Sequence, residues 1–263
     1  MIVFGAIIPH SPLLIESIGK DQREKLKTTV DAIAQIEQAM YLAKPETLVI
    51  IAPHGPRYPD AFSANMSGNY TGTLKSFGDF STTIEAKSDY MLIDRAHRKM
   101  REEDIPFTLT SAEELDYSFT IPILLLARHL QNWKLFPISP SMMDGKAHYE
   151  FGRQIKRVLH MEKRRVAVIA SADLSHKLTA QSPGGASDEG PKFDQMIQQH
   201  VLTEDPTPLL TMPAEIIENS GQCGYRPICT LLGMMDKMNV TREVLSYEAP
   251  FGVGYMTTKF DIA

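Results

Sequence analysis

Three apolar segments of the sequence each end at a polar turn that carries a histidine. In residues 47–52 the run Thr-Leu-Val-Ile-Ile-Ala stops at Pro53, and His54 follows at once. Such a run is typical of a strand that is buried on both faces of a sheet. The three segments are 2–8, 47–52 and 165–170, and the histidines that follow them are His10, His54 and His176. Because ligands bind beyond the carboxyl ends of the strands in open α/β sheets, we expect these histidines to converge on a metal or a substrate.

The rest of the chain alternates between helical and strand-like patterns. Residues 20–43 carry apolar side chains at helical spacing, and Pro45 ends that helix. With the strands at 2–8 and 47–52 this helix predicts a β-α-β unit, right-handed if the two strands are parallel neighbours. Further helices are expected at 88–103, 121–130, 146–159, 193–202 and 225–238, and further strands at 106–110, 133–138, 240–248 and 254–260.

This alternation predicts one α/β domain over residues 1–263, with a central mixed, mostly parallel sheet and helices on both of its faces. Residues 55–80 are rich in Gly, Ser, Asn, Pro and Tyr, which favours either a long functional loop or a small irregular sheet. The segment 179–190 has the composition of a mobile lid over a site.

Composition limits the classes of protein to be considered. Hydrophobic residues make up 43% of the 263 positions and charged residues 22%, which is ordinary for a soluble globular chain. The net charge of −5 argues against a nucleic-acid partner. No signal peptide is recognised, and no apolar run approaches the roughly 20 residues of a membrane span. The two cysteines, Cys223 and Cys229, form neither a disulfide framework nor a zinc-knuckle spacing, and a cytoplasmic protein is expected.

Two histidines from neighbouring strand ends and one anionic ligand could form a three-ligand metal site. Such a site leaves positions open for substrate and O₂ on ferrous iron, or for water on zinc. Cys223 is a candidate for the third ligand because it lies just before the start of a helix, where the thiol pKa is expected to be lowered. The carboxylates that could take this place instead are those of Glu215, Glu218 and Glu248.

Asp173 lies three residues before His176, so it could accept the imidazole N–H and fix the tautomer of that ring. The alternative is that Asp173 only caps the next turn. The remaining histidines lie in helical, charged surroundings and are expected at the surface; they are His97, His129, His148, His160 and His200.

Four short motifs follow one another along the chain. They are Pro-His-x-Pro at 9–12, Pro-His at 53–54, Asp-x-x-His at 173–176 and Cys-Gly-x-x-Pro-Ile at 223–228. In their order and distribution they resemble the superfamily of class III extradiol ring-cleavage dioxygenases, especially its Memo-like branch (AmmeMemoRadiSam system proteins). The resemblance extends over essentially the whole chain, from residue 2 to the strand at 252–260.

The resemblance implies an α/β fold with a metal site at the strand ends. In the ring-cleaving enzymes two histidines and a glutamate hold Fe(II), catechol chelates the metal beside O₂, and a separate histidine is the acid/base. Carried onto this sequence, His10 and His54 would be metal ligands and His176 the acid/base residue. The position of the glutamate corresponds to Cys223, as in the Memo-like branch, where this cysteine can join the histidines on the metal.

Two positions depart from the ring-cleaving pattern. A thiolate in place of a carboxylate changes the redox behaviour of the metal and is itself oxidisable. The ring-cleavers also have a histidine in a Leu-Asp-His-Gly pattern, where this chain has Leu115-Asp116-Tyr117-Ser118. Tyr117 can donate a hydrogen bond to substrate or oxygen, but a phenol is a poor general base near neutral pH.

Three hypotheses follow. The first is a non-haem Fe(II) oxidoreductase of the dioxygenase type, in which His10, His54 and Cys223 bind the metal, His176 is the acid/base, Asp173 orients it and Tyr117 contacts substrate or oxygen. The second is a Memo-like metal- or phosphopeptide-binding protein without turnover, working beside a radical-SAM protein and an AMMECR1-like protein. The third is a zinc hydrolase that uses the same ligands. A homo-oligomer is compatible with each of them.

Overall fold

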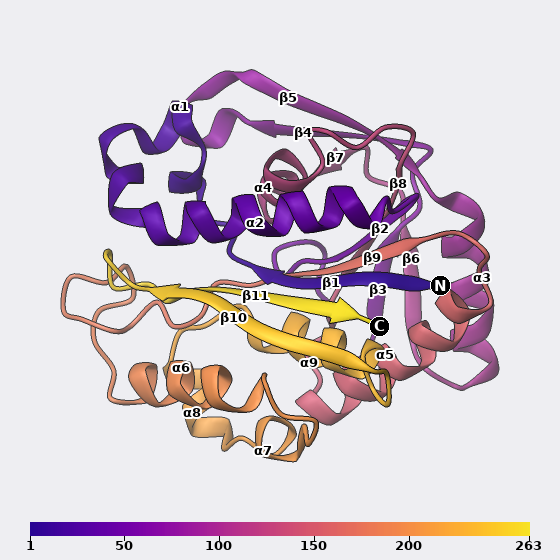
Figure 1. Cartoon of the computed structure of the whole chain (residues 1–263). Helices are drawn as coiled ribbons and strands as arrows, with labels where there is room; N and C mark the ends of the chain where they lie inside the picture. The colour runs from indigo at the N-terminus through magenta and orange to yellow at the C-terminus, as the bar shows by residue number, and fades with distance from the viewer.

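A sheet of eleven strands runs through the protein, and helices cover both of its faces (Figure 1). The computed structural model describes residues 1–263. Its strands are β1 Ile2–Ile8, β2 Thr47–Ile51, β3 Phe62–Asn65, β4 Asn69–Leu74, β5 Asp79–Ser88, β6 Phe107–Thr110, β7 Glu114–Leu115, β8 Lys134–Ser139, β9 Val166–Ser171, β10 Val240–Glu248 and β11 Tyr255–Ile262. The predicted fold class, α/β with a central mixed sheet between helices, is confirmed. The assignment of residues 1–263 to a single ring-cleaving-type domain stays a prediction.

The centre of the sheet is parallel, and the pairings outside it are mixed parallel and antiparallel. The order is β10-β11-β1-β9-β2-β8-β5-β4-β7, and β3 pairs with β8 and β6 beside this path. Strands β1, β9, β2 and β8 are parallel neighbours, whereas β10 and β11 continue the sheet in antiparallel pairing. The predicted β-α-β unit therefore does not join neighbours, because β9 lies between β1 and β2. The carboxyl ends of these three strands consequently meet at one edge.

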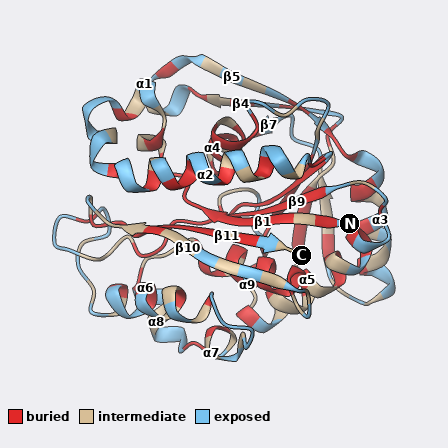
Figure 2. Ribbon diagram, in the orientation of Figure 1, coloured by how far each residue is buried: buried red, intermediate tan, exposed pale blue.

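Alternate residues of the central strands supply the two hydrophobic cores. In β2, Leu48 and Ile50 face one core, while Val49 and Ile51 face the other. The core that contains Leu48 and Ile50 is covered by three helices, α1 Glu16–Gly19, α2 Lys27–Ala43 and α4 Tyr117–Leu126. The core that contains Val49 and Ile51 is covered by the other six, α3 Tyr90–Glu102, α5 Gly145–His160, α6 Glu189–His200, α7 Thr207–Leu210, α8 Ala214–Asn219 and α9 Tyr225–Met234. Figure 2 shows the result: β5 and β10 carry many exposed and half-buried residues, whereas the central strands β1, β2 and β9 are buried along most of their length. Burial on both faces explains why these strands are continuous apolar runs.

Helices α5 and α9 pack against each other at two glycines. A Cβ at Gly152 would overlap the carbonyl oxygen of Thr230, and a Cβ at Gly233 would overlap the carbonyl oxygen of Tyr149. The two backbones thus approach more closely than any side chain would allow. This contact fixes α9 in place. Helix α9 starts at Tyr225, and only Gly224 separates it from Cys223.

Several predicted boundaries differ from the observed ones for local reasons. The expected helix at 20–43 is a 3-10 segment, Lys20–Leu26, followed by α2. The helix expected at 121–130 already starts at Tyr117, because the side chain of Asp116 caps it by accepting from Ser118 N. Residues 55–80 contribute strands to the main sheet, so the alternative of a long loop is wrong.

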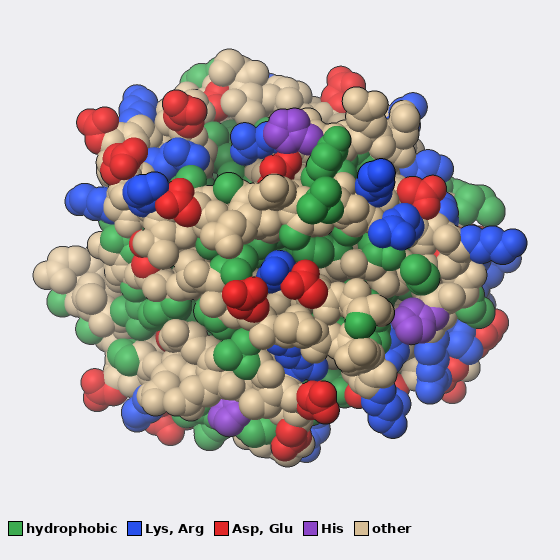
Figure 3. All heavy atoms as spheres, viewed as in Figure 1, with side chains coloured by type: hydrophobic (Ala, Val, Ile, Leu, Met, Phe, Trp, Pro, Cys, Tyr) green, Lys and Arg blue, Asp and Glu red, His purple; other side chains and the backbone are tan.

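The segment 179–190 is fastened to its surroundings. Ser182 Oγ donates to Gly252 O at 2.7 Å, and Gly184 N donates to His176 O at 3.1 Å. Its role as a lid stays a prediction. No helix combines the length and the apolar character that crossing a membrane requires. On the face shown in Figure 3, acidic and basic side chains are interspersed.

Candidate metal centre

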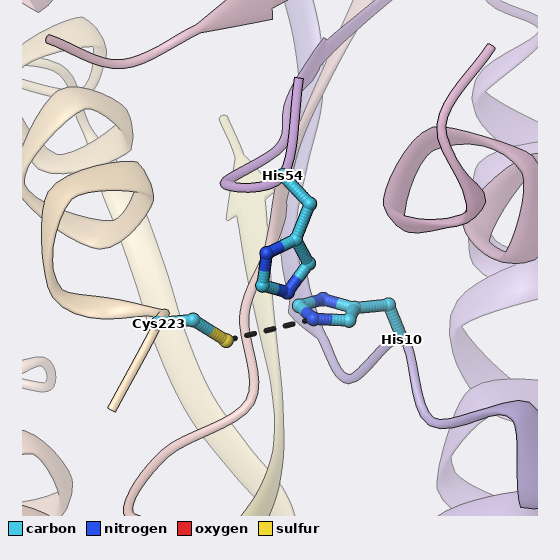
Figure 4. A group of neighbouring side chains, drawn as sticks. All are labelled: His10, His54 and Cys223. Carbon is cyan, nitrogen blue, oxygen red and sulfur yellow. Dashed lines mark hydrogen bonds between the residues drawn. The ribbon is translucent and has the colours of Figure 1, made fainter. Parts of the chain in front are cut away.

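His10, His54 and Cys223 converge at the edge where β1 and β2 end (Figure 4). Their donor atoms all lie within 4.8 Å of one another, and Cys223 Sγ is 3.5 Å from His10 Nε2. Metal–nitrogen and metal–sulfur bonds of roughly 2.1 and 2.3 Å place two such donors about 3.1–3.6 Å apart on one ion. The observed separation of sulfur and nitrogen therefore fits a shared metal, and the three side chains form a suitable donor set.

His10 is held in the tautomer that leaves Nε2 free. The side chain is 1% exposed, and its Nδ1 lies 2.9 Å from Ser171 Oγ. Ser171 Oγ donates its own proton to Ser118 O at 2.7 Å, so it can only accept from His10. His10 Nδ1 therefore carries the proton, and the lone pair of Nε2 points to the donor cluster. Such an outer contact is the usual way of orienting a metal-binding histidine.

The rings of His54, His10 and Tyr117 pack against one another, and those of His10 and Tyr117 meet edge to face at a centroid distance of 5.8 Å. The ring of His54 meets that of His10 edge to face at a centroid distance of 5.1 Å and stacks on Tyr117 at 5.2 Å. Burial lowers the pKa of His54 to about 4, and burial also lowers the pKa of His10. Both imidazoles are therefore neutral near pH 7, which is the form that binds metals.

The thiol of Cys223 does not have the lowered pKa that its place before a helix predicts. Burial, and then the charge of Asp173, raise the pKa of the thiol well above its usual value. Desolvation outweighs the start of α9, so that prediction is wrong for the protein without a cation. A bound divalent cation reverses the balance, because coordination removes the thiol proton.

Asp173 supports His10 more directly than it supports His176. Its Oδ1 accepts from His10 N at 2.9 Å, while its Oδ2 is 3.8 Å from His10 Nε2 and 3.9 Å from His176 Nε2. The expected hydrogen bond from His176 is thus not formed, since 3.9 Å exceeds hydrogen-bond range. Asp173 also does not act as a helix cap. The side chain of His176 is partly exposed, and its buried Nδ1 has no hydrogen-bond partner.

The three glutamates considered as the third ligand lie elsewhere. Glu215 and Glu218 are exposed, and Glu248 Oε1 accepts from Thr29 N at 2.7 Å in the first turn of α2. The structure thus brings Cys223, and none of these carboxylates, to the two histidines. Whether the three residues act as ligands in solution stays a prediction, as do the roles of Asp173, His176 and Tyr117.

A pocket of about 360 Å³ opens beside His54. The side chains that line it include those of Asn65, Asp116, Phe119 and Ser139. The pocket gives a small molecule room next to one candidate ligand. Its walls combine an aromatic ring with polar groups, which is typical of small-molecule sites.

One histidine expected at the surface is buried. His148 lies on α5, where its Nδ1 is 2.7 Å from Asp144 O and its ring packs edge to face on Phe62 at 4.9 Å. The charged neighbours in the sequence were misleading, because position 148 shares the apolar face of α5 with Phe151 and Ile155.

Sequence reasoning also missed residues that support the site. Ser171 and Ser118 set the tautomer of His10, and Tyr255 is buried at the start of β11, close to Ser11. Ser171 could have been noticed because it directly follows the apolar segment 165–170 and ends β9. For Ser118 and Tyr255 the sequence contains no signal of their proximity.

Asp194 of α6 is a buried carboxyl behind the loop of His176. It is 1% exposed; its Oδ1 accepts from Ser175 N at 2.8 Å and its Oδ2 from Tyr247 OH at 2.7 Å. Burial raises the pKa of Asp194 to about 7, despite these two donors. Folding therefore favours the protonated acid, and the carboxylate form is costly to bury.

This shift predicts a pH-dependent stability. The carboxyl has a pKa near 4 when unfolded, so its contribution is most favourable below about pH 4 and is lost as the pH rises through about 7. Asp194→Asn should abolish this trend, because an amide can accept from Ser175 N without ionising. Relative to the parent, the variant should gain up to about 4 kcal/mol of unfolding free energy between pH 4 and 8. Urea unfolding at a series of pH values measures this difference, and parallel curves for the two proteins would contradict it.

A family model matches almost the whole chain. The family model described as the catalytic LigB subunit of aromatic ring-opening dioxygenase matches residues 5–258. A protein of Clostridium acetobutylicum is 24% identical over 264 residues, which cover 97% of this chain and 56% of that relative. This chain therefore spans little more than half the length of that relative.

Two archaeal relatives carry the description MEMO1 family protein. That of Methanococcus maripaludis is 24% identical over 219 residues, covering 77% of this chain and 72% of the relative. That of Methanocaldococcus jannaschii is 22% identical over 249 residues, covering 92% and 76%. Among solved structures, an uncharacterized protein of Escherichia coli K12 has the same fold, with a TM-score of 0.69, 15% identity, and coverage of 98% of this chain and 99% of that one.

Proposed function

The chain belongs to the family of the catalytic LigB subunit of aromatic ring-opening dioxygenases, within its Memo-like branch, and on that premise we propose that it is a metal-dependent oxidoreductase. It would act with O₂ on a catechol-like or other small oxidisable substrate. The observation that carries this proposal is the meeting of two neutral imidazoles and one thiol, with donor atoms within 4.8 Å, at the carboxyl ends of β1 and β2. The pocket beside His54 supports it by providing room for such a substrate.

His10, His54 and Cys223 would hold the metal, which we propose to be Fe(II). Bound Fe(II) would supply the redox chemistry with O₂ and open positions for the oxygens of a substrate. The hydrogen-bond chain from His10 through Ser171 to Ser118 keeps one imidazole aimed at the site. This arrangement is preorganised, so the protein would need little rearrangement to bind the ion.

His176 and Tyr117 divide the proton chemistry between them in this proposal. His176 is partly exposed beside Asp173, so it can exchange protons with a substrate hydroxyl and with solvent. Burial raises the pKa of Tyr117, so this phenol stays protonated and donates a hydrogen bond to substrate or oxygen. His176 would accordingly be the acid/base, and Tyr117 a donor that positions the reacting group.

Metal analysis of anaerobically purified protein, with Cys223→Ser as the variant, tests the donor set. We expect about one iron per chain in the parent and a loss of iron affinity of about tenfold or more in Cys223→Ser, since a hydroxyl replaces the thiolate. Cys229→Ser is the matched control, because Cys229 is buried inside α9 and away from the two histidines. Equal iron content in parent and Cys223→Ser would remove the thiol from the site. Oxygen uptake with a panel of catechols then tests the reaction.

A second function is favoured by two positions in the site. Cys223 and Tyr117 stand where ring-cleaving relatives have glutamate and histidine, and the raised pKa of Tyr117 removes it as a base. In this case the protein would bind a metal or a peptide without turnover, beside a radical-SAM protein and an AMMECR1-like protein. Full iron loading without oxygen uptake would favour this function. Zinc-containing, colourless protein with esterase activity would favour a zinc hydrolase instead.

A further inference from the structure

A second pocket, of about 780 Å³, lies where β4, β5 and the start of β8 meet. Its polar and aromatic lining includes Asn69, Glu85, Lys87, Asn132, Trp133 and Lys134. Lys134 is the strand partner of Thr47 at the start of β2, whereas His54 follows the end of that strand. The pocket therefore lies toward the amino ends of the central strands, at the edge opposite to the candidate metal centre.

Strand pairing holds two lysines of this pocket side by side. Lys87 of β5 is the direct partner of Lys134 of β8 in their parallel pairing. Neighbouring strands are about 4.8 Å apart, and partner residues carry their side chains on the same face of the sheet. Just beyond this pair, Asp89 N donates to Leu135 O at 2.8 Å, which holds the register. The backbone thus brings two ammonium groups to adjacent positions on one face.

The charges of these two lysines are not compensated within the protein. Both side chains are exposed and neither forms an ion pair, whereas Lys259 of β11 is paired with Glu243 and Asp261. Glu85, the one carboxylate of the lining, forms no ion pair either. Like charges at neighbouring positions repel each other, so a bound anion would stabilise this arrangement. A phosphate monoester, with a charge of about −1.5 to −2 at pH 7, matches two lysines better than a single carboxylate does.

The remaining lining supplies an aromatic ring and two amides. Trp133, the single tryptophan of the chain, is half-buried. Asn132 directly before it has a φ of 55°, a left-handed conformation that asparagine adopts more readily than most residues. Asn69 is the partner of Lys87 on β4, so a polar row crosses three strands. An indole face can stack on any nucleobase, and an asparagine amide can both donate to and accept from the edge of a base.

We propose that this pocket binds a mononucleotide, with the phosphate on Lys87 and Lys134 and the base on Trp133. Its volume lies within the range of roughly 300–1,000 Å³ that is typical of small-molecule sites. The pocket shares no residue with the donor cluster or with the pocket beside His54. It is therefore a second ligand site, and it stands whether or not the metal centre is catalytic.

Fluorescence of Trp133 reports directly on this pocket. The parent protein is titrated with the monophosphates of adenosine, guanosine, cytidine and uridine, with the four nucleosides, and with inorganic phosphate. At least one nucleotide should quench the fluorescence saturably and bind at least about tenfold more tightly than its nucleoside, which lacks the charge-assisted contacts. Lys87→Gln and Lys134→Gln should each weaken that nucleotide by about threefold or more, and leave the nucleoside unaffected, because each removes one of two exposed charges.

Lys146→Gln is the charge-matched control for these variants. Lys146 is exposed in the first turn of α5 and, like the two lysines of the pocket, forms no ion pair; α5 follows the carboxyl end of β8. Its loss should leave nucleotide binding unchanged. Parental nucleotide affinity in both Lys87→Gln and Lys134→Gln, or a nucleoside that binds as tightly as its nucleotide, would overturn the proposal.

The role of the indole is tested by calorimetry, because substituting Trp133 removes the fluorescence signal. Trp133→Phe keeps a ring and should retain most of the nucleotide affinity, whereas Trp133→Ala should lose at least about fivefold, since stacking of a base is worth about 1–3 kcal/mol. Inorganic phosphate that binds as tightly as the nucleotides would overturn base recognition. Neither quenching nor heat with any of the four nucleotides would overturn the site altogether.

Discussion

His54→Ala is expected to lower the affinity of the protein for Fe(II) by at least about 100-fold. Losing an outer contact to a metal ligand already costs up to about 100-fold, and this variant removes a ligand itself. The variant removes one of the three donors of the cluster and leaves His10 and Cys223 in place. His54 makes no hydrogen bond to the rest of the protein and is only partly buried, so its removal should leave the fold intact. Iron per chain after anaerobic loading, and a competition titration with a chelator, measure the effect.

A surface histidine gives the matched control for this experiment. His160 is exposed at the end of α5, and His160→Ala should bind iron like the parent. Far-ultraviolet circular dichroism of both variants shows whether the fold is kept. If His54→Ala retained parental iron affinity, the metal would have to lie elsewhere, and the donor cluster would be a polar pocket without a coordinating role.

Gly233→Ala is expected to destabilise the protein by about 3 kcal/mol, at the upper end of what overpacking costs. A methyl group at this position would overlap the carbonyl oxygen of Tyr149, so α9 would have to move away from α5. Because a backbone atom and not a flexible side chain is in the way, the strain cannot be relieved by a rotamer change. Chemical denaturation at pH 7, followed by fluorescence of the single tryptophan, Trp133, measures the loss.

Gly68→Ala is the control for this prediction, because a Cβ at Gly68 would have nothing within 4 Å. Its unfolding free energy should stay within about 0.5 kcal/mol of the parent value. Gly233→Ala should also weaken metal binding, since the start of α9 follows the loop of Cys223. Unchanged stability in Gly233→Ala would mean that the α5–α9 contact is looser than the structure indicates.

The strands that carry the candidate ligands were predictable from sequence because their burial leaves a strong local signal. β1 coincides with the predicted segment 2–8, and β2 and β9 deviate only slightly from their predicted ranges, at their ends. The insertion of β9 between β1 and β2 was not predictable. Every strand in the centre of the sheet is equally apolar, so nothing in a single sequence specifies which pair are neighbours.

The histidines of the candidate site were predictable for a different reason. In an open α/β sheet, a histidine that follows a buried strand lies at the carboxyl end of that strand, where ligands bind. This rule alone was enough to single out His10 and His54 from the sequence. The direction in which the pKa of the Cys223 thiol is shifted was not predictable, because the shift depends on desolvation by residues distant in sequence. The same limit applies to Asp173, whose hydrogen bond to His10 N joins segments 163 positions apart.

The pairing of β1 has a consequence for the order in which the protein matures. This first strand lies between β9 and β11, so that Ile2 faces Val166 and Gly5 faces Phe260. During synthesis β1 leaves the ribosome long before either neighbour exists, and pairings over such sequence distances form slowly. The two strands that pair with β1 are therefore complete only after residue 171 for β9 and after residue 262 for β11. Because the candidate donors come from positions 10, 54 and 223, an ion can meet the complete donor set only once the chain has been made at least as far as Cys223 and has folded.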